Sequence, residues 1–483
     1  MELLMIIGFI FGVGYFLSVT EPSKRKNHNT SSLAVKPAAS VVTPKPQLNV
    51  KKVDIDQIKL SEEQQSVFKI IEENRVNAYV TGKAGTGKSV LLQYFVEHTE
   101  KNVAVVAPTG VAALNVGGQT IHSFFKLAPE LQDLSTLRVD YKTKEVLRHL
   151  DTVVIDEISM VRADLMEAIN IKLQLARGND LPFGGVQVVM FGDLYQLPPV
   201  VTDGQLRRYF DHNYGGIYFF NAHVYKKTEL KIFELSRIFR QKDEDFKILL
   251  NAIRNGKHSP EILDKLNSRA DVVIPESGFV TLAGHNTTVS YINHEKLEKI
   301  AGEPKVYVAE ITGDLKESAF PTEKELKLKV GAQVMLLKND KQKPVRWVNG
   351  TLGVVTKLGD DVIRVNIDGV EHSVPKETWN SIRYYYDAET RKLEKDIVSS
   401  FTQFPLRLAW AITIHKSQGQ TYQSVAVDLS DGAFAHGQTY VALSRCQSLA
   451  GLYLGSKIKS EDIIVDQEVV EFMKQSEILS VNS

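Results

Sequence analysis

The sequence has little cysteine and no excess of charge of either sign. One cysteine, Cys446, occurs in 483 residues, so no disulfide can form within the chain, which is typical of a reducing compartment. Lys plus Arg and Asp plus Glu number 58 each, which excludes a basic field spread over the whole protein. Any site for a polyanion must therefore be a local groove.

Charge is also missing from the start of the chain. No charged residue occurs from Leu3 to Val19, and a helix of that length spans about 26 Å, just short of the ~30 Å hydrocarbon core of a bilayer. A secretory signal places basic residues before its apolar run, whereas here the basic cluster from Lys24 to Lys26 follows it. This order predicts a membrane anchor through residues 3–20, with the N-terminus outside and the folded body on the cytoplasmic side.

The same hydrophobic segment is compatible with two alternatives. It could be an uncleaved hydrophobic helix packed on the folded body, or the start codon could be assigned wrongly. Gly8 and Gly12 have the GxxxG spacing that pairs membrane helices, but glycine is common in such segments. Residues 27–56 are rich in Ser, Thr, Pro, Asn and Lys and show no apolar period, so we expect a flexible tether there.

The remainder has the composition of a folded enzyme. The chain is 43% hydrophobic and 24% charged, and its length predicts two or three domains. Apolar runs followed by helical segments recur, as in "NVAVVAP", "TVVID" and "QVVMFGD". This alternation predicts an α/β fold in which helices cover both faces of parallel sheets. Ligands of such sheets bind at the carboxyl ends of the strands.

A glycine-rich loop follows one of these strands. After "NAYVT" the sequence reads "GKAGTGKS" and then turns helical, which is the context of a P-loop. The glycines let backbone N–H groups approach phosphate oxygens, and the helix N-terminus adds positive potential. The lysine reaches the outer phosphates and the serine hydroxyl can bind Mg²⁺. We therefore predict a nucleotide site at Gly82, Lys83, Ala84, Gly85, Thr86, Gly87, Lys88 and Ser89.

Acidic and amide residues follow two further strands. The run "TVVIDEISM" ends a strand in Asp156 and Glu157. The acid after such a strand holds Mg²⁺ in P-loop enzymes, so we predict Asp156 and Ser89 as metal ligands. Glu157 is placed to polarise a water for attack on the γ-phosphate. Gln196, in "GDLYQLPPV", suits hydrogen bonding to the γ-phosphate, although this segment alone leaves that role open.

The second half of the chain contains polar residues with two possible roles. Arg240 and Arg445 can be surface or salt-bridge residues, or arginine fingers that neutralise transition-state charge from a neighbouring domain. The run "TIHKSQ" suits phosphate contacts along a nucleic-acid strand, although a single histidine such as His415 or His122 is more often a buried structural residue. This run contributes Thr413, His415, Lys416, Ser417 and Gln418.

A change of pattern marks an insertion at about residues 303–404. Short alternating strands replace the longer apolar runs, and the turn pairs Asn349-Gly350 and Asp368-Gly369 favour hairpins. We expect a small β-barrel inserted into a second α/β domain. The tyrosines of "YYYDAE" could stack on bases, but tyrosine is equally common in β-strands.

Taken together, these segments resemble the superfamily 1 DNA helicases of the PIF and RecD type. The similarity covers nearly all of residues 58–470. It follows the order "LSEEQ", "GKAGTGKS", "APTGVAALNVGGQTIHSFF", "VVIDEISM", "PFGGVQVVMFGDLYQLPPV", "IFRQ", "WAITIHKSQGQT" and "YVALSR". The combination of the "EISM", "PFGG", "GDLYQLPPV" and "TIHKSQG" segments is characteristic of PIF helicases.

The resemblance implies a role for each of these residues. ATP is the implied nucleotide, with Mg²⁺ as its metal. Gln64 falls on the family's adenine-recognising glutamine. The implied ATPase residues are Lys88, Ser89, Asp156, Glu157, Gln196, Arg240 and Arg445. The implied contacts with single-stranded DNA are Thr109, Thr120, His122 and the run from Thr413 to Gln418.

The resemblance also implies an architecture and an activity. Two RecA-like P-loop domains would occupy residues 57–235 and residues 236–302 with 405–483. A wedge-like insertion would lie at about 127–149, and an SH3-like β-barrel at 303–404. The protein would move 5′-to-3′ on single-stranded DNA and unwind tailed duplexes. The family does not generally carry a membrane span, so the predicted anchor at residues 1–26 is a departure from its pattern.

Two other activities stay open from the sequence. The protein could be a membrane-tethered ATPase switch that binds nucleic acid without separating strands, or a helicase directed to RNA.

Overall fold

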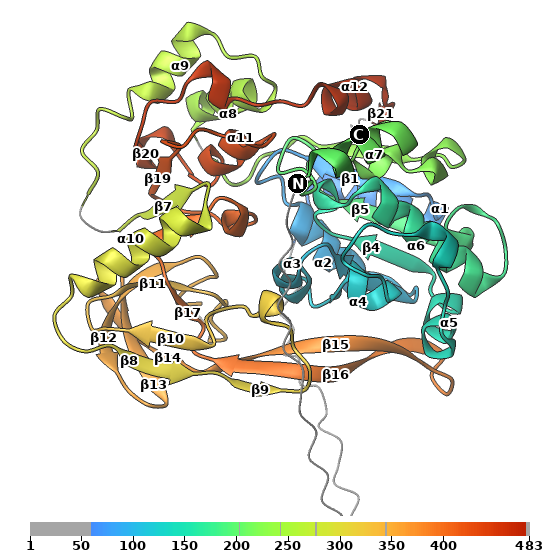
Figure 1. Ribbon diagram of the computed structural model, residues 1–483, viewed down its shortest axis with the longest axis horizontal. Coiled ribbons are helices and arrows are strands. Elements are labelled where there is room, and N and C mark those ends of the chain that lie inside the picture. Colours follow the sequence, from blue (N-terminus) through green and yellow to red (C-terminus); the bar gives the residue numbers. More distant parts are fainter. Residues whose placement is uncertain (1–58, 202, 242, 276–277, 343–344, 480–483) are drawn as a thin grey trace, which may run out of the picture. The chain divides into compact units, whose positions relative to one another are not determined.

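The computed structural model describes residues 59–479, apart from residues 202, 242, 276–277 and 343–344. The predicted anchor and tether lie outside the described residues. Within the described ranges, none of the helices combines the length and the hydropathy that a bilayer crossing requires. The described chain contains two α/β units and an antiparallel β insertion (Figure 1).

The first α/β unit is built on a seven-stranded parallel sheet, in the order β21-β6-β1-β5-β4-β2-β3. Successive strand residues alternate between two hydrophobic cores, one on each face, which explains the continuous apolar runs in the sequence. The strands are β1 (Ala78–Gly82), β2 (Val103–Ala107), β3 (Gln119–Thr120), β4 (Thr152–Ile155), β5 (Gln187–Phe191), β6 (Lys231–Leu235) and β21 (Ile478–Leu479).

Helices cover both faces of this sheet. The first begins with the capping box that its sequence predicts, because the Ser61 hydroxyl accepts from the Gln64 backbone N–H and the Gln64 side chain accepts from the Ser61 N–H. The predicted insertion at about 127–149 contains α5, which packs on α6. The helices are α1 (Glu62–Asn74), α2 (Lys88–His98), α3 (Gly110–Asn115), α4 (Ile121–Phe125), α5 (Tyr141–Arg148), α6 (Ala163–Arg177) and α7 (Gly204–Asn213).

The C-terminal segment returns to the first unit. Helix α12 (Gln467–Gln475) buries Val469 and Met473 in the core beside α6, and β21 pairs in parallel with β6. The boundary expected from the sequence places residues 405–483 entirely in the second α/β unit. The structure differs because the apolar residues of α12 match the surface of the first unit, a contact that no local pattern encodes.

The second α/β unit has a four-stranded parallel sheet, in the order β18-β7-β19-β20. One core joins this sheet to three of its helices, whereas the buried Leu297 of the fourth packs in the core of the insertion. The strands are β7 (Val280–Ala283), β18 (Ala411–Thr413), β19 (Val425–Asp428) and β20 (Leu452–Leu454). The helices are α8 (Glu244–Arg254), α9 (Pro260–Asn267), α10 (Asn286–Glu298) and α11 (Gln438–Leu443).

The insertion between β7 and β18 is antiparallel, as its alternating pattern predicts. The hairpin at Asp368-Gly369 is confirmed, since both residues have positive φ and join β13 to β14. The described strands form a five-stranded sheet and a two-stranded sheet around one core, and the SH3-like barrel stays a prediction. These strands are β8 (Lys305–Val308), β10 (Glu325–Leu328), β11 (Gln333–Leu336), β12 (Leu352–Leu358), β13 (Val362–Ile367), β14 (Val370–Pro375) and β17 (Leu406–Leu408).

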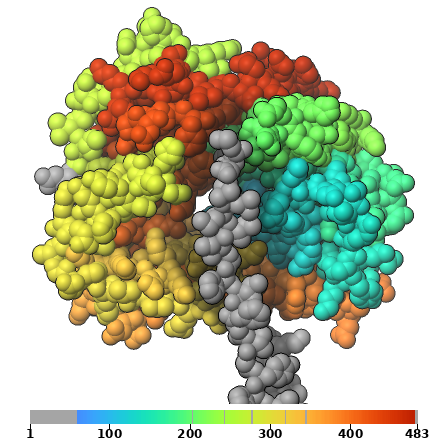
Figure 2. All heavy atoms as spheres, viewed as in Figure 1, coloured from blue at the N-terminus to red at the C-terminus, as the bar shows by residue number. Residues whose placement is uncertain are grey.

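A long hairpin of the insertion reaches the first α/β unit. It consists of β15 (Glu377–Asp387) and β16 (Lys392–Gln403), and β9 (Glu310–Thr312) pairs with its base. The Val105 N–H donates to the Tyr384 hydroxyl at 3.0 Å, and Lys395 donates to the Gly117 carbonyl at 2.9 Å. In the space-filling view, the orange surface of the hairpin lies beneath the cyan surface of the first unit (Figure 2).

Candidate nucleotide and nucleic-acid sites

The P-loop connects the end of β1 to the start of α2, as the sequence predicts. Gly85 and Gly87 have φ values of +85° and +81°, a left-handed conformation that glycine enters without strain. A Cβ on Gly85 would collide with the Cβ of Arg240. Glycine is therefore needed here both for the turn and for the close approach of the chain that follows β6.

A cavity of about 510 Å³ lies beside this loop. The P-loop and strand ends of the first unit line one part of it, and the segments around Arg240, Gly419 and Arg445 line the rest. All of the predicted catalytic residues meet there. The lining includes Ala84, Gly85, Thr86, Gly87, Lys88, Ser89, Asp156, Glu157, Gln196, Arg240 and Arg445.

Lys88 and the P-loop backbone are in direct contact. The Lys88 ammonium donates to the carbonyl oxygens of Gly82 at 2.6 Å and Lys83 at 3.2 Å. Burial lowers the pKa of Lys88, and the carboxylates of Asp193 and Glu157 oppose that shift. The ammonium is thus held within the loop by neutral acceptors, where phosphate oxygens can replace them.

The two acids at the end of β4 share one buried environment. Burial, followed by the neighbouring charge of Glu157, raises the pKa of Asp156 to about 7. Burial also raises the pKa of Glu157, while Lys88 and Arg445 pull it down. A carboxyl with a raised pKa in a cavity is a better proton acceptor than an exposed one.

The two predicted arginines lie at the same cavity. Arg445 is 1% exposed, and it donates to the Val441 carbonyl and the Ser444 hydroxyl, both at 2.9 Å. Arg240 donates to the Gly419 carbonyl at 3.3 Å. Burial lowers the pKa of both guanidinium groups, and the charge of Arg445 lowers that of Arg240 further. Their partners are neutral, so both positive charges are available to an anionic ligand.

The two predicted glutamines occupy different positions. Gln64 is 3% exposed, and its amide donates to the Gly87 carbonyl at 3.2 Å. It lies behind the P-loop rather than among the residues that line the cavity. Gln196 lines the cavity, and its amide donates to the Asp193 carboxylate at 3.3 Å.

Asp193 and Arg254 are two residues of the site that the sequence does not single out. They form a buried ion pair at 3.0 Å, in which Asp193 comes from the end of β5 and Arg254 from the end of α8. Burial tends to raise the pKa of Asp193, but Arg254 and Lys88 outweigh it and hold that pKa below its usual value. The one signal in the sequence is the position of Asp193 after an apolar strand, as with Asp156.

The residues present fit a magnesium ion that is bound together with phosphate. Ser89, in the first turn of α2, and Asp156 both line the cavity. Groups of three or more His, Cys, Asp or Glu residues that could hold a metal by themselves do not occur in the described part of the chain. Mg²⁺ commonly uses one or two protein oxygens and takes its other ligands from phosphate and water.

The predicted DNA contacts of the first unit lie at the carboxyl edge of its sheet. The hydroxyl oxygens of Thr109 and Thr120 cap α3 and α4 by accepting backbone N–H groups at 3.2 Å and 3.1 Å. Both hydroxyls retain a hydrogen that a phosphate can accept. His122 is half-buried, and burial, with help from Arg162, lowers its pKa.

The run from Thr413 to Gln418 is less open than its sequence suggests. Ser417 is fully buried and donates to the Ile414 carbonyl at 2.7 Å. Thr413 is 4% exposed and accepts from the Lys416 N–H at 3.2 Å. These two hydroxyls build the turn after β18, which corrects the expectation that every polar residue of the run faces a ligand. Lys416 is exposed, and His415 and Gln418 are half-buried.

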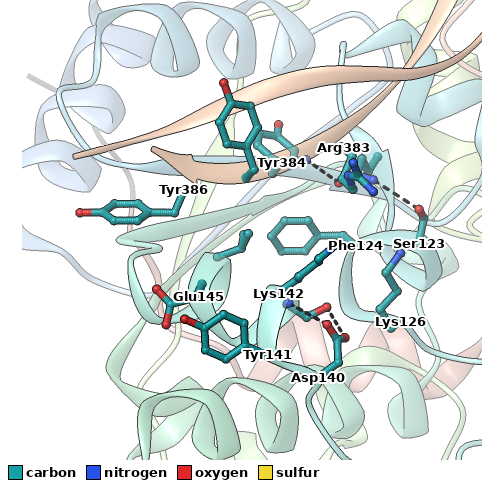
Figure 3. Close-up of a pocket in the computed structure, with 14 residues that line it drawn as sticks. Ser123, Phe124, Lys126, Asp140, Tyr141, Lys142, Glu145, Arg383, Tyr384 and Tyr386 are labelled. Carbon is teal, nitrogen blue, oxygen red and sulfur yellow. Dashed lines mark hydrogen bonds between the residues drawn. The ribbon is translucent and has the colours of Figure 1, made fainter. Parts of the chain in front are cut away.

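Two tyrosines of "YYYDAE" pack the hairpin against the first unit. Tyr384 is 4% exposed, packs edge-on against Phe124 and accepts from the Val105 N–H. Tyr386 stacks on His149 at 3.5 Å between ring centroids. Both borders of a cavity of about 250 Å³ are visible in Figure 3, with Tyr384 and Tyr386 on one side and Asp140, Tyr141 and Lys142 on the other. A base-stacking role for Tyr384 is therefore wrong, because its ring is covered by the first unit.

Comparisons with known proteins relate the chain to a family of helicases. The family model for PIF1-like helicase matches residues 59–262, and that for the DNA helicase Pif1 2B domain matches residues 311–358. The chain is 35% identical to the ATP-dependent DNA helicase Pif1 of Bdellovibrio bacteriovorus, over 88% of this chain and 93% of that protein.

Two solved structures are also similar. Pif1 from Bacteroides sp in complex with ADP-AlF4 has a TM-score of 0.80 and 40% identity, over 86% of this chain and 97% of that one. Bacteroides Pif1 bound to ssDNA has a TM-score of 0.63 and 42% identity, with the same coverage. The chain therefore belongs to the PIF1-like helicase family, and its two α/β units correspond to the RecA-like domains of that family.

Proposed function

We propose that this protein uses ATP to move 5′-to-3′ along single-stranded DNA and so to separate duplex DNA. One observation carries the proposal: a single cavity is lined by the P-loop of the first unit and by Arg240 and Arg445, which both follow β6 in the chain. A nucleotide there touches both RecA-like units. The similar protein of Bdellovibrio bacteriovorus is an ATP-dependent DNA helicase, and Bacteroides Pif1 was solved with single-stranded DNA.

The first step is binding of ATP. The backbone N–H groups of the P-loop and the Lys88 ammonium receive the phosphates, in place of the Gly82 and Lys83 carbonyls that Lys88 contacts. Ser89 and Asp156 would hold Mg²⁺, which supplies positive charge to the phosphate oxygens. Arg240 and Arg445 add two charges from the second unit, so binding favours closure of the two units around the nucleotide.

The second step is hydrolysis. Glu157 accepts a proton from a water whose oxygen attacks the γ-phosphorus, while the bond from that phosphorus to the bridging oxygen of ADP breaks. The two arginines neutralise the charge that develops on the phosphoryl oxygens. The Gln196 amide donates a hydrogen bond to an oxygen of the same phosphate. Loss of the γ-phosphate removes the anion that held the units together.

The third step is movement on DNA. Thr109 and Thr120 lie on the first unit and Lys416 on the second, so each unit has its own polar contacts for a phosphate backbone. Closure and reopening change the distance between these two sets. If one set holds while the other slides, each ATP moves the protein along the strand.

Unwinding of tailed duplexes tests this function directly. We expect ATP-dependent strand release from a duplex with a 5′ single-stranded tail and none from the same duplex with a 3′ tail. The measurement uses the full chain and a version lacking residues 1–50. Release from the 3′ tail alone would contradict the direction. ATP hydrolysis stimulated by DNA without any strand release would favour a switch, and preference for RNA tails would favour an RNA helicase.

Residues 3–20 would place this activity at a membrane. Their lack of charge and the basic cluster that follows them support an anchor with its N-terminus outside and the catalytic body on the cytoplasmic face. We expect the full chain to sediment with membranes after cell fractionation, and removal of residues 1–26 to release it. Recovery of the full chain entirely in the soluble fraction would contradict the anchor.

A further inference from the structure

Arg254 links the second α/β unit to the nucleotide site of the first. It is the last residue of α8, whose other buried residues pack in the core of the second unit. Its guanidinium is 3.0 Å from the Asp193 carboxylate and 4.0 Å from the centre of the Tyr195 ring, both in the first unit. Arg254 is 5% exposed and Asp193 is 1% exposed, so water does not screen this contact.

Asp193 connects Arg254 to a residue of the nucleotide cavity through hydrogen bonds. One carboxylate oxygen accepts from Arg254 and from the Tyr195 N–H at 3.2 Å. The other oxygen accepts from the Gln196 amide nitrogen at 3.3 Å. The Gln196 side chain lines the nucleotide cavity, so a continuous chain of polar contacts runs from Arg254 through Asp193 to that cavity.

Other contacts fix the same short segment to the second unit. His436 lies 2.8 Å from the Leu194 carbonyl, and a Cβ on Gly437 would collide with the Tyr195 carbonyl. The Tyr440 hydroxyl accepts from the Ala84 N–H of the P-loop at 3.0 Å. Movement of the second unit must therefore displace residues 193–196 or break these contacts.

A role in stability alone does not explain why Arg254 and Asp193 are paired here. Burying two charges costs desolvation energy, and such pairs are often no more stabilising than apolar residues of similar volume. Here the Arg254 Nε is buried without a hydrogen-bond partner among the described residues, so even the guanidinium is incompletely satisfied. The pair joins two units that must move, and its carboxylate orients a side chain at the nucleotide.

We propose that Arg254 is a positioning residue, which acts through Asp193 to orient Gln196 toward the γ-phosphate and thereby makes hydrolysis depend on the position of the second unit. The proposal rests on the proposed function, in which the two units move relative to one another during each ATP cycle. Arg254 itself lies outside the lining of the cavity.

The test is ATP hydrolysis by the full chain, with saturating single-stranded DNA and without DNA. We expect Arg254→Gln to lower the DNA-stimulated kcat by roughly 10- to 100-fold, because a misplaced catalytic group typically costs that much. The KM for ATP should stay within about threefold, since the P-loop contacts remain. Gln196→Ala should have a similar effect.

The decisive measurement is the double variant. If Arg254 acts through Gln196, Arg254→Gln adds no further loss of kcat in the Gln196→Ala background, because residues in one contact chain are not additive. Independent, multiplying losses would overturn the proposal, as would a DNA-stimulated kcat for Arg254→Gln equal to that of the unchanged protein. Arg254→Lys keeps one charged contact with Asp193 and should restore part of the activity.

Two further variants separate this role from folding. Arg269→Gln is the matched control, because among the described residues the Arg269 side chain donates to the Leu452 and Ala450 carbonyls, both within the second unit. A kcat loss equal to that of Arg254→Gln would overturn the proposal. Arg254→Gln combined with Asp193→Asn removes both charges of the pair, so neither is left without its partner, and should still show the kcat loss. Failure of the unchanged protein to separate strands would contradict the proposed helicase function. The role of Arg254 is tested separately, by the kcat of each variant relative to that of the unchanged protein.

Discussion

Replacement of Arg240 by alanine should lower the kcat for ATP hydrolysis by about 10³-fold or more, the effect expected for loss of an arginine that neutralises transition-state charge. Arg240 contacts the Gly419 carbonyl and approaches the P-loop at Gly85. It is only half-buried, so its loss should leave the fold intact. Steady-state ATPase assays with single-stranded DNA would measure the loss of kcat. Binding of a labelled ATP analogue would show that the nucleotide site is still formed.

The matched control is Arg237→Ala. Arg237 is exposed, lies three positions earlier and does not itself line the cavity; its guanidinium lies over the ring of Phe239, which does line it. It should retain nearly full kcat. In Arg240→Ala the affinity for the nucleotide should fall far less than kcat, because the Arg240 guanidinium makes most of its contribution in the transition state. If Arg240→Ala hydrolyses ATP within about tenfold of the unchanged protein, Arg240 does not act as an arginine finger.

Replacement of Glu157 by glutamine should lower kcat by about 10²- to 10⁴-fold, the contribution of a general base. The change keeps the size of the side chain and removes its ability to take a proton. Burial raises the pKa of the Glu157 carboxyl, so the glutamine also avoids burying a charge, and its stability should be equal or higher. Affinity for ATP should be retained, which a filter-binding or fluorescence assay can establish.

The control for this change is Glu97→Gln. Glu97 is near the end of α2, about 13 Å along the helix from Lys88, and should not affect hydrolysis. Asp156→Asn provides a second comparison. Raising the magnesium concentration should restore part of the kcat that Asp156→Asn loses, but none of the kcat that Glu157→Gln loses. A Glu157→Gln protein that retains most of its kcat would show that another group takes the proton.

Local chemistry determines which parts of the site can be read from the sequence. The P-loop is recognisable because glycine, lysine and serine must occur in a fixed order between a strand and a helix. Asp156 and Glu157 follow an apolar run, and strand ends of a parallel sheet meet at one edge. The structure places these residues and both predicted arginines around one cavity, although the arginines can be chosen only through the resemblance.

Features that depend on contacts between distant residues cannot be read in this way. The alternation of β15 and β16 is visible in the sequence, but nothing there indicates that Tyr384 bonds to Val105, 279 positions away. Polar residues of the 413–418 run look equivalent in the sequence, yet Ser417 is fully buried and Lys416 is exposed. Which of them faces outward depends on how the turn packs beneath Arg445.

Residue types at short spacings are enough to predict the chemistry of the nucleotide site, the parallel sheets and the family. Three other features become visible in the folded chain alone: α12 and β21 complete the first unit, the hairpin of the insertion docks there, and Arg254 pairs with Asp193. These contacts join residues far apart in the chain. Their free energy comes from burial and charge complementarity between folded surfaces, and those surfaces exist only once the local elements have assembled.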